Sequence, residues 1–358
     1  MNSPAVITIF SSRIGDIEYV RSNFSGIYFY AGKVSFLPRI LQKCQIQSIF
    51  IFKEDFSQEF SKFVRENKIQ FCEYESLDEL KKLCEKAEKD SNSASSKNFF
   101  DDNSLDFKNA QKMSPVFASL IGDSPAMKKL CSQIIRVAAF DVSVLLLGET
   151  GTGKTTIAKA IYQLSQRRNA EFSSSVLANV SENLIEATLF GVVKGAYTDA
   201  RTKDGLFVKT RGGVLHLDEI GEISLDIQTK LLQVLSEGII FPVGSNDEIH
   251  VDNRMIFSTN ANLALKMQQK LFREDLYYRI NEVTLKVPPL RERIEDIPAL
   301  CQAIIKEEKL KVGISDTAIK VLQTLHWKGN IRELTNVLKS AAVFCENHII
   351  QAKDIASR

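Results

Sequence analysis

The sequence has no long apolar run and no paired cysteines, and these absences exclude several classes of protein. No apolar stretch approaches the ~18 residues of a membrane-spanning helix, so we expect no membrane span. The start, Met1-Asn2-Ser3-Pro4, lacks the charged and apolar regions of a secretory signal, so we expect none. The six cysteines include no Cys-x-x-Cys pair. Such spacing suits reduced, mostly buried thiols in a cytoplasmic protein, and excludes a disulfide framework or a zinc site.

An excess of charge of one sign is also lacking. The 46 Lys and Arg residues nearly balance the 44 Asp and Glu residues, which leaves a net charge of +2. No global basic field therefore argues for nucleic acid. Apolar residues make up 44% and charged residues 25% of the chain, as in soluble globular proteins. A length of 358 residues allows two or three domains.

A glycine-rich segment between a strand and a helix predicts a phosphate-binding loop. Residues 142–147 are apolar except for Ser143 and predict a buried strand, and residues 156–162 have helical apolar spacing. Between them stands Gly148-Glu149-Thr150-Gly151-Thr152-Gly153-Lys154-Thr155. The glycines allow a tight turn that aims backbone N–H groups at phosphates, and the helix start adds positive potential. Lys154 can reach the outer phosphates, and the Thr155 hydroxyl can ligate Mg²⁺.

Two more apolar strands end in polar residues that suit phosphoryl transfer. Residues 212–219 form a glycine turn and a strand that ends in Asp218 and Glu219. Asp218 is placed to hold the Mg²⁺ shell opposite Thr155, and Glu219 to orient and polarise a water molecule. Residues 254–260 end in Asn260, which can bond the γ-phosphate or the water, although Asn is also a common turn former.

The first ninety residues alternate between strand-like and helix-like segments. We expect strands at 6–10, 26–30, 48–52 and 69–74, and helices near 15–22, 36–43, 58–66 and 77–89. This alternation predicts a small α/β domain with a mainly parallel sheet, which resembles a truncated response-regulator receiver. Where a receiver has its acidic pair stands Ser11-Ser12-Arg13, and Asp55 has no carboxylate partners. We therefore expect an interaction or dimerisation module that is not phosphorylated.

Downstream motifs resemble those of one family. They are Leu120-Ile121-Gly122, the run 228–235, Phe272-Arg273-Glu274-Asp275-Leu276, Pro288-Pro289-Leu290-Arg291-Glu292-Arg293 and Trp327-Lys328-Gly329-Asn330-Ile331-Arg332. With the phosphate-binding loop they resemble the AAA+ ATPases that activate the sigma-54 form of bacterial RNA polymerase, the bacterial enhancer-binding proteins. The resemblance covers roughly residues 117–355.

We expect an α/β architecture of four parts, the first two from the residue patterns and the last two from the resemblance. These are a receiver-like domain over 1–87, a flexible Ser- and Asn-rich linker over 88–114, a three-layer P-loop AAA+ domain over 115–290 and a helical lid over 291–358. Lid helices are expected at 294–308, 316–325, 330–347 and 352–357, with Ser315 and Asn330 as N-caps. The family usually continues into a DNA-binding helix-turn-helix, but no basic recognition helix remains to assign before Arg358. Either further residues follow in the natural protein, or it acts without specific DNA contact.

The resemblance also implies a shared nucleotide site. The protein would form a hexameric ring, or a dimer that assembles into one, with ATP and Mg²⁺ at each subunit boundary. Arg273 and Arg279 would reach the neighbour's γ-phosphate in trans, and Arg332 would contact the nucleotide from its own lid. The nucleotide-binding set would be Ile121, Gly148, Glu149, Thr150, Gly151, Thr152, Gly153, Lys154, Thr155, Thr156 and Arg332.

The chain departs from the family where the nucleotide site connects to its client. The family grips sigma-54 with a Gly-Ala-Phe-Thr-Gly-Ala loop; here the partner loop reads Gly195, Ala196, Tyr197, Thr198, Asp199 and Ala200. Further departures are Thr188 for Glu, Val176 for an Asn that couples the catalytic Glu to the loop, Pro242 for Arg and Lys328 for Pro. Thr155 replaces the family's usual Glu and is closer to a generic P-loop. The coupling apparatus is therefore altered more than the nucleotide site.

Three functions follow from these observations. The first is an ATP-hydrolysing activator that remodels sigma-54 RNA polymerase through residues 195–200. The second is a nucleotide-binding regulatory ring that acts by protein interaction without remodelling sigma-54; Val176, Asp199 and Pro242 favour it. The third is an AAA+ machine with an unrelated client, against which the family-specific runs argue.

Overall fold

The computed structural model describes most of the chain beyond residue 113 and shorter parts before it. The described residues are 5–10, 28–30, 45–52, 62, 64–66, 70–74, 76, 78–80, 82, 83, 110, 112, 114–120, 122–179, 182–196 and 201–356. The predicted helices 15–22 and 36–43, Asp55, Ile121 and partner-loop residues 197–200 lie outside them. Among the described residues, no helix is both long and apolar enough to cross a membrane.

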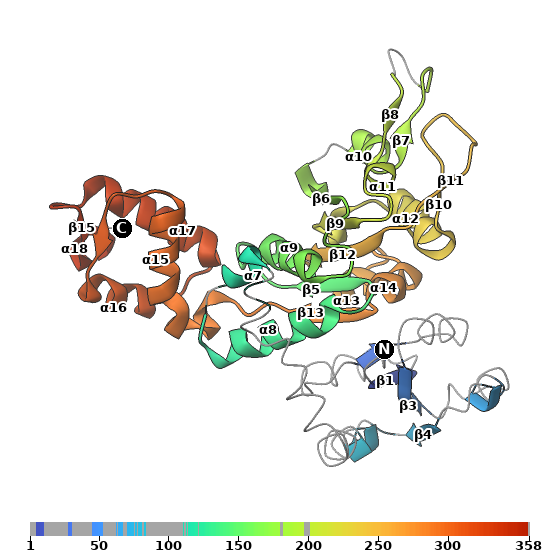
Figure 1. The fold of residues 1–358 in the computed structure, drawn as a ribbon, viewed down its shortest axis with the longest axis horizontal. Helices are drawn as coiled ribbons and strands as arrows, with labels where there is room; N and C mark the ends of the chain where they lie inside the picture. The colour runs from blue at the N-terminus through green and yellow to red at the C-terminus, as the bar shows by residue number, and fades with distance from the viewer. Residues whose placement is uncertain are drawn as a thin grey trace.

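The N-terminal part contains a parallel sheet. Its strands are β1 (Ala5–Phe10), β2 (Tyr28–Tyr30), β3 (Gln45–Phe52) and β4 (Gln70–Tyr74). They pair in the order β2-β1-β3-β4, and Figure 1 labels β1, β3 and β4 of this sheet. This is the order of the first four strands in the flavodoxin-like fold, which receivers share. The alternating sequence pattern had predicted such a sheet.

The central domain is built on a second parallel sheet in the order β13-β5-β12-β9-β6 (Figure 1). Its strands are β5 (Val144–Leu147), β6 (Phe172–Val176), β9 (Val214–Asp218), β12 (Arg254–Thr259) and β13 (Val283–Lys286). The surrounding helices are α7 (Pro115–Ala118), α8 (Pro125–Ala138), α9 (Lys154–Leu164), α10 (Glu182–Phe190), α11 (Leu206–Lys209), α12 (Leu225–Glu237), α13 (Leu263–Gln268) and α14 (Glu274–Ile280), with short 3₁₀ turns η3 (Leu177–Asn179) and η4 (Ile220–Glu222).

The central strands β5, β9 and β12 are covered on both faces, which explains why they are largely apolar. Val144 and Val214 point to the face packed by α8 and α9, and Ala110 is buried in the same cluster. Leu145 and Leu217 point to the other face, in the cluster of α10 to α14. Because the strands are parallel, their carboxyl ends meet at one edge, and the polar residues that follow them are brought together there.

The lid is a separate helical core, shown at the left of Figure 1. Its elements are η5 (Leu290–Glu292), η6 (Ile294–Asp296), α15 (Ile297–Glu307), β14 (Gly313–Ile314), α16 (Asp316–Thr324), α17 (Asn330–Phe344), β15 (Ile349–Ile350) and α18 (Ala352–Ala356). Ser315 caps α16 as predicted, since its hydroxyl accepts from the Ala318 N–H at 3.2 Å. The predicted cap at Asn330 is wrong. Gly329 occupies that position, and the Asn330 side chain contacts the phosphate-binding loop instead.

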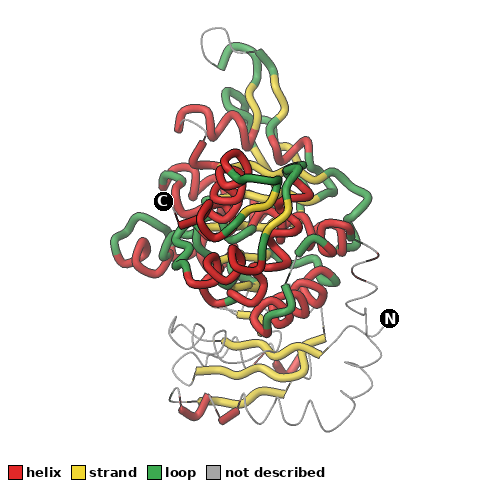
Figure 2. Tube along the Cα trace, turned by 90° about the vertical axis from the view of Figure 1, so that its left-hand side faces the viewer, coloured by secondary structure: helices red, strands yellow, loops and turns green. Residues whose placement is uncertain are grey.

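Two antiparallel hairpins complete the domain. They are β7 (Gly191–Val192) with β8 (Lys203–Asp204), and β10 (Ile239–Ile240) with β11 (Ile249–His250). Figures 1 and 2 both show the β7–β8 hairpin at the end of the molecule away from the N-terminal sheet. The partner loop lies between β7 and β8, so the sequence that resembles a client-gripping loop is carried on a projecting hairpin.

Candidate nucleotide site

The phosphate-binding loop follows β5 and leads directly into α9, as the sequence predicts. Gly151 and Gly153 have φ angles of 79° and 99°, in the left-handed region that favours glycine. A Cβ on Gly151 would lie 2.4 Å from the Gly329 carbonyl oxygen. Glycine is therefore required here both for the turn and for the approach of the lid.

Lys154 is held at the base of this loop with only 6% of its surface exposed. Its Nζ donates to the carbonyl oxygens of Gly148 at 2.9 Å and Glu149 at 3.3 Å. Burial lowers the pKa of Lys154, while the nearby Glu219 and Asp218 carboxylates act to raise it. The ammonium is thus tethered inside the loop by carbonyl contacts that a phosphate oxygen could replace.

Three separate segments meet at the mouth of the loop. The Glu219 Oε1 atom lies 3.9 Å from Lys154 Nζ, and Glu219 Oε2 accepts from the Asn260 backbone N–H at 3.2 Å. The Asn260 side-chain amide donates to the Thr150 hydroxyl at 2.7 Å. Glu219 adopts a left-handed φ of 57°, which is uncommon for a residue with a side chain. The structure therefore brings Lys154, Glu219, Asn260 and Thr150 together.

Asp218 is anchored from the neighbouring strand, a feature that sequence reasoning missed. Its Oδ1 accepts from the Ser258 hydroxyl and from the Glu219 N–H at 3.0 Å. Ser258 in turn contacts His216 Nε2 at 2.6 Å, and His216 Nδ1 contacts the Ser174 hydroxyl at 2.8 Å. Burial lowers the pKa of His216 to about 4, although Asp218 acts to raise it. The available signal was a histidine and a serine inside otherwise apolar strands.

The lid closes on the same loop through Glu149. Two Arg291 nitrogens donate to the two Glu149 carboxylate oxygens at 2.8 and 2.6 Å, and Asn330 Nδ2 adds a bond at 3.1 Å. These contacts lower the pKa of Glu149 to about 2. Asn330 also bonds the Thr150 carbonyl oxygen, and Leu290 N–H donates to Asn330 Oδ1 at 2.7 Å. The Glu149 side chain thus pairs with the lid.

Other predicted nucleotide contacts surround the loop. Thr155 and Thr156 are exposed at the start of α9, and Thr152 is buried with its hydroxyl bonded to the Glu149 carbonyl oxygen. Arg332 is exposed near the start of α17, close enough that its Cβ would lie 3.1 Å from a Cβ on Gly151. Each of these side chains is therefore placed at the loop edge or beneath it.

Oxygen ligands for a metal ion are present at this edge. The Thr155 hydroxyl and the Asp218 carboxylate are the donor types that Mg²⁺ prefers, with nucleotide phosphates completing its shell. No cluster of three or more His, Cys, Asp or Glu side chains suited to a metal occurs among the described residues. The Thr155 hydroxyl and the Asp218 carboxylate fit a Mg²⁺ ion whose remaining ligands come from nucleotide phosphates and water.

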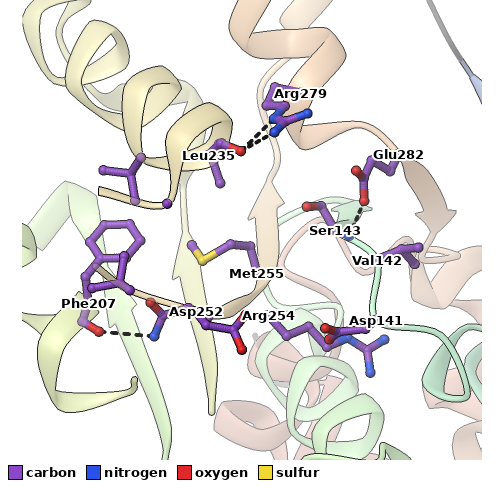
Figure 3. Close-up of a pocket in the computed structure, with 14 residues that line it drawn as sticks. Asp141, Val142, Ser143, Phe207, Leu235, Asp252, Arg254, Met255, Arg279 and Glu282 are labelled. Carbon is purple, nitrogen blue, oxygen red and sulfur yellow. Dashed lines mark hydrogen bonds between the residues drawn. The ribbon is translucent and has the colours of Figure 1, made fainter. Parts of the chain in front are cut away.

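The two predicted trans arginines lie away from the loop and differ from each other. Arg273 is partly exposed, and its guanidinium pairs with Asp275 at 2.7 Å and bonds the Thr229 hydroxyl at 3.1 Å. Arg279 is only 8% exposed, and it donates to the Leu235 carbonyl oxygen beside a cavity of about 160 Å³ (Figure 3). Arg273 is thus the more accessible of the two.

The partner-loop hairpin is attached mainly through backbone contacts. Val193 N–H donates to the Val243 carbonyl oxygen at 3.1 Å, and Val243 N–H donates to the Gly191 carbonyl oxygen at 2.9 Å. Gly244 has a φ of 83°, and a Cβ there would lie 2.5 Å from the Ala196 Cβ. The segment that contains Pro242 therefore supports the base of the partner loop at Gly195 and Ala196.

The remaining departures lie between the nucleotide site and the hairpin. Val176 ends β6 directly opposite Asp218 in the strand register, with 36% of its surface exposed. Thr188 is half-buried on α10, the helix that leads into β7. An apolar side chain at Val176 offers no hydrogen bond to the neighbouring carboxylates.

A phosphate-binding loop on this parallel sheet, an acidic strand end and a helical lid define a P-loop ATPase domain of the AAA+ fold. Residues 120–286 match the family model of the sigma-54 interaction domain, and residues 291–358 match that of the AAA+ ATPase lid domain. Residues 120–358 therefore belong to the family of sigma-54-dependent AAA+ activators.

Individual relatives agree with this assignment. The chain is 42% identical over 243 residues to the Nif-specific regulatory protein of Azotobacter vinelandii, a match that covers 66% of this chain and 46% of the relative. It is 39% identical over 256 residues to the transcriptional regulator NtrC of Klebsiella pneumoniae, covering 70% and 54%. The chain thus spans about half the length of the curated relatives it matches.

Solved structures resemble the fold over nearly the whole chain. NtrX from Brucella abortus in complex with ATP has a TM-score of 0.61 at 25% identity, covering 99% of this chain and 86% of NtrX. NtrX in complex with ADP has the same TM-score at 24% identity and covers 100% and 87%. The structural match therefore covers the N-terminal sheet as well as the AAA+ domain.

Proposed function

We propose that this chain is an ATP-hydrolysing activator that remodels sigma-54 RNA polymerase through the partner loop at 195–200. One observation carries the proposal: Lys154, Glu219 and Asn260, from three separate segments, meet at the mouth of the phosphate-binding loop. Family membership of residues 120–358 supports the choice of client. The oligomer would be a ring, as the family resemblance implies.

The residues divide the work of phosphoryl transfer, which requires positioning and charge neutralisation more than covalent chemistry. The loop backbone and Lys154 bind the phosphates. Glu219 orients the attacking water and accepts its proton, and the Asn260 backbone N–H fixes the Glu219 carboxylate. Asp218 and Thr155 would hold Mg²⁺, which neutralises phosphate charge when bound.

A partly exposed arginine completes the site from a neighbouring subunit. Arg273 can exchange Asp275 for a phosphate of the next protomer at little cost, because exposed ion pairs are weak. Arg279 would first have to leave the Leu235 carbonyl oxygen. We therefore assign the trans contact to Arg273 and a supporting role to Arg279.

Steady-state hydrolysis tests this proposal. Wild-type protein should hydrolyse ATP with a specific activity that rises with protein concentration as subunits assemble. Lys154→Ala should abolish ATP binding, measured by fluorescent nucleotide titration. Absence of turnover at every protein concentration would contradict the enzyme assignment.

A second function is favoured by Val176, which places an apolar side chain beside Asp218 where the family would couple the catalytic Glu to the hairpin. Under this alternative the ring binds nucleotide as an assembly signal and acts by protein interaction. It predicts nucleotide-dependent assembly with no nucleotide-dependent capture of sigma-54.

A further inference from the structure

A line of polar side chains crosses three neighbouring strands on one face of the central sheet. Ser174 on β6 is the register partner of His216 on β9, and Ser258 on β12 is the register partner of Asp218. His216 and Asp218 are two residues apart, so they point to the same face. Around His216 this face is otherwise apolar, with Val214 and Ile256 in the cluster covered by α8 and α9.

The contacts in this line have one consistent direction. A carboxylate only accepts, so the Ser258 hydroxyl donates its single proton to Asp218 Oδ1. Ser258 Oγ must then accept from His216 Nε2, which lies at 2.6 Å. In the neutral ring, Nδ1 carries no proton and accepts from the Ser174 hydroxyl at 2.8 Å. Every donor in the line is thus aimed toward Asp218.

Burial makes this direction strict for the inner members. His216 and Ser258 are both 0% exposed. A buried polar group that loses its partner costs about 1–3 kcal/mol. Within the described chain, none of the buried side-chain atoms that lack a hydrogen-bond partner belongs to this line. The line is satisfied only while Asp218 serves as its terminal acceptor.

The outer end of the line differs from the inner end. Ser174 is exposed on the edge strand β6, so water can replace its hydroxyl. At the inner end, Asp218 Oδ1 accepts two hydrogen bonds, whereas Oδ2 accepts none from the described residues. The line therefore occupies one carboxylate oxygen and leaves the other for a ligand.

We propose that His216 is a positioning residue that acts through Ser258 to fix the Asp218 carboxylate, leaving Oδ2 for the metal that accompanies the nucleotide. This inference rests on the proposed function, which assigns the metal role to Asp218. His216 touches neither nucleotide nor water. It sets the orientation of Ser258, and Ser258 sets the orientation of the carboxylate.

Magnesium-dependent binding of a non-hydrolysable fluorescent ATP analogue tests the proposal. His216→Phe and Ser258→Ala should each weaken the apparent Mg²⁺ affinity about 10-fold, with nucleotide affinity in the absence of Mg²⁺ unchanged. The double variant should bind Mg²⁺ no more weakly than the worse single variant, because both changes break the same line of hydrogen bonds. Ser258→Thr keeps a hydroxyl at this position and should retain the wild-type Mg²⁺ affinity. Ser174→Ala should change the Mg²⁺ affinity less than about 2-fold.

Ser175→Ala is the matched control, since this neighbour on β6 points to the opposite face. Effects of His216→Phe and Ser258→Ala that add, or that appear only as lower thermal stability, would overturn the proposal in favour of simple packing.

Histidine-selective ¹⁵N NMR gives a readout independent of turnover. The chain has 4 histidines, of which His250, His326 and His348 are exposed. The buried His216 ring should be held in the Nε2–H tautomer in the wild-type protein, and this NMR signature should be lost in Ser258→Ala. An Nδ1–H tautomer of His216 would refute the proposed direction of these hydrogen bonds. If Mg²⁺–nucleotide binding responds as expected but ATP is not hydrolysed, the proposed function fails and this inference stands.

Discussion

The nucleotide end and the hairpin end of the AAA+ domain are held by different kinds of contact. At the nucleotide end many of the bonds are made by side chains, as with Glu149 and Arg291 or Ser258 and Asp218, beside backbone bonds such as that from the Ile331 N–H to the Gly151 carbonyl oxygen. At the hairpin the bonds join backbone atoms of Val193, Val243 and Gly191. Side-chain bonds require particular residues, whereas backbone bonds tolerate any residue with a free N–H or carbonyl. The hairpin can therefore vary in sequence without losing its attachment.

Pro242 illustrates this tolerance. Proline lacks a backbone N–H, but the hairpin bonds use the N–H and carbonyl of Val243 next to it. A departure that looks severe in sequence thus leaves the backbone connection intact. Val176 differs, because the side chain itself would have to make the coupling contact. Under the proposed function, Val176 on β6 would therefore be the weak point between the nucleotide site and the hairpin.

The largest effect should come from the proposed subunit boundary. Arg273→Ala should lower ATP turnover about 10³-fold, the scale of other arginine fingers, while nucleotide binding by the isolated chain and its stability stay unchanged. Turnover measured at saturating ATP and protein concentration checks this. The matched variant is Arg279→Ala, which should lower the free energy of unfolding by about 1–3 kcal/mol because it removes the donor to the Leu235 carbonyl oxygen. Equal behaviour of the two variants would contradict the division of roles.

The next effect should separate binding from chemistry at the nucleotide end. Glu219→Gln should lower turnover about 10²-fold or more, because the residue no longer accepts a proton. ATP affinity should remain within about 2-fold, since the amide can still accept the Asn260 N–H. Single-turnover hydrolysis alongside nucleotide titration checks both values. Loss of affinity together with turnover would indicate a binding role.

A third change tests the hairpin end alone. Gly244→Ala adds a Cβ that would lie 2.5 Å from the Ala196 Cβ, so the partner loop must shift. Sigma-54 capture should fall about 10-fold while basal ATP turnover stays within about 2-fold of wild type. Glu219→Gln, in contrast, should lower turnover. Gly212→Ala is the control, because its φ of 74° carries similar strain but its Cβ would meet nothing within 4 Å. If both variants lower capture equally, backbone strain is the cause.

The smallest effect concerns pH and the lid. Contacts with Arg291 and Asn330 lower the pKa of Glu149 from its usual 4.5 to about 2. A depressed carboxyl pKa adds stability that is present above pH 4.5 and is lost as the pH falls toward 2. The Tm difference between wild type and Glu149→Gln should therefore be about 1–2 °C at pH 7 and vanish near pH 2. A difference that grows on acidification would refute the contact.

Most of the central fold could be predicted from local patterns. The glycine-rich loop, the strand ending in Asp218 and Glu219 and the capped helix at Ser315 all follow rules that act within about ten residues. Asn330 shows where such rules stop. Its sequence position suits a helix cap, but the lid brings it against Thr150, and this long-range contact decides its role.

The buried line to Asp218 could not be predicted for the same reason. Ser174, His216 and Ser258 are far apart in sequence, and only the strand order places them side by side. The burial of Arg279 against α12 likewise depends on packing between helices. Local spacing identified the charged residues near the site, but tertiary contacts determine which of their side chains are free to contact a ligand.

The most direct test of the account is capture of purified sigma-54 by the chain held with a transition-state analogue of ATP. Under the proposed function, capture requires the analogue and is lost in Thr198→Ala. Lys154→Ala should capture nothing, because the nucleotide end must be filled before the hairpin end can act. No capture of sigma-54 by protein that hydrolyses ATP would contradict the account and favour the regulatory ring.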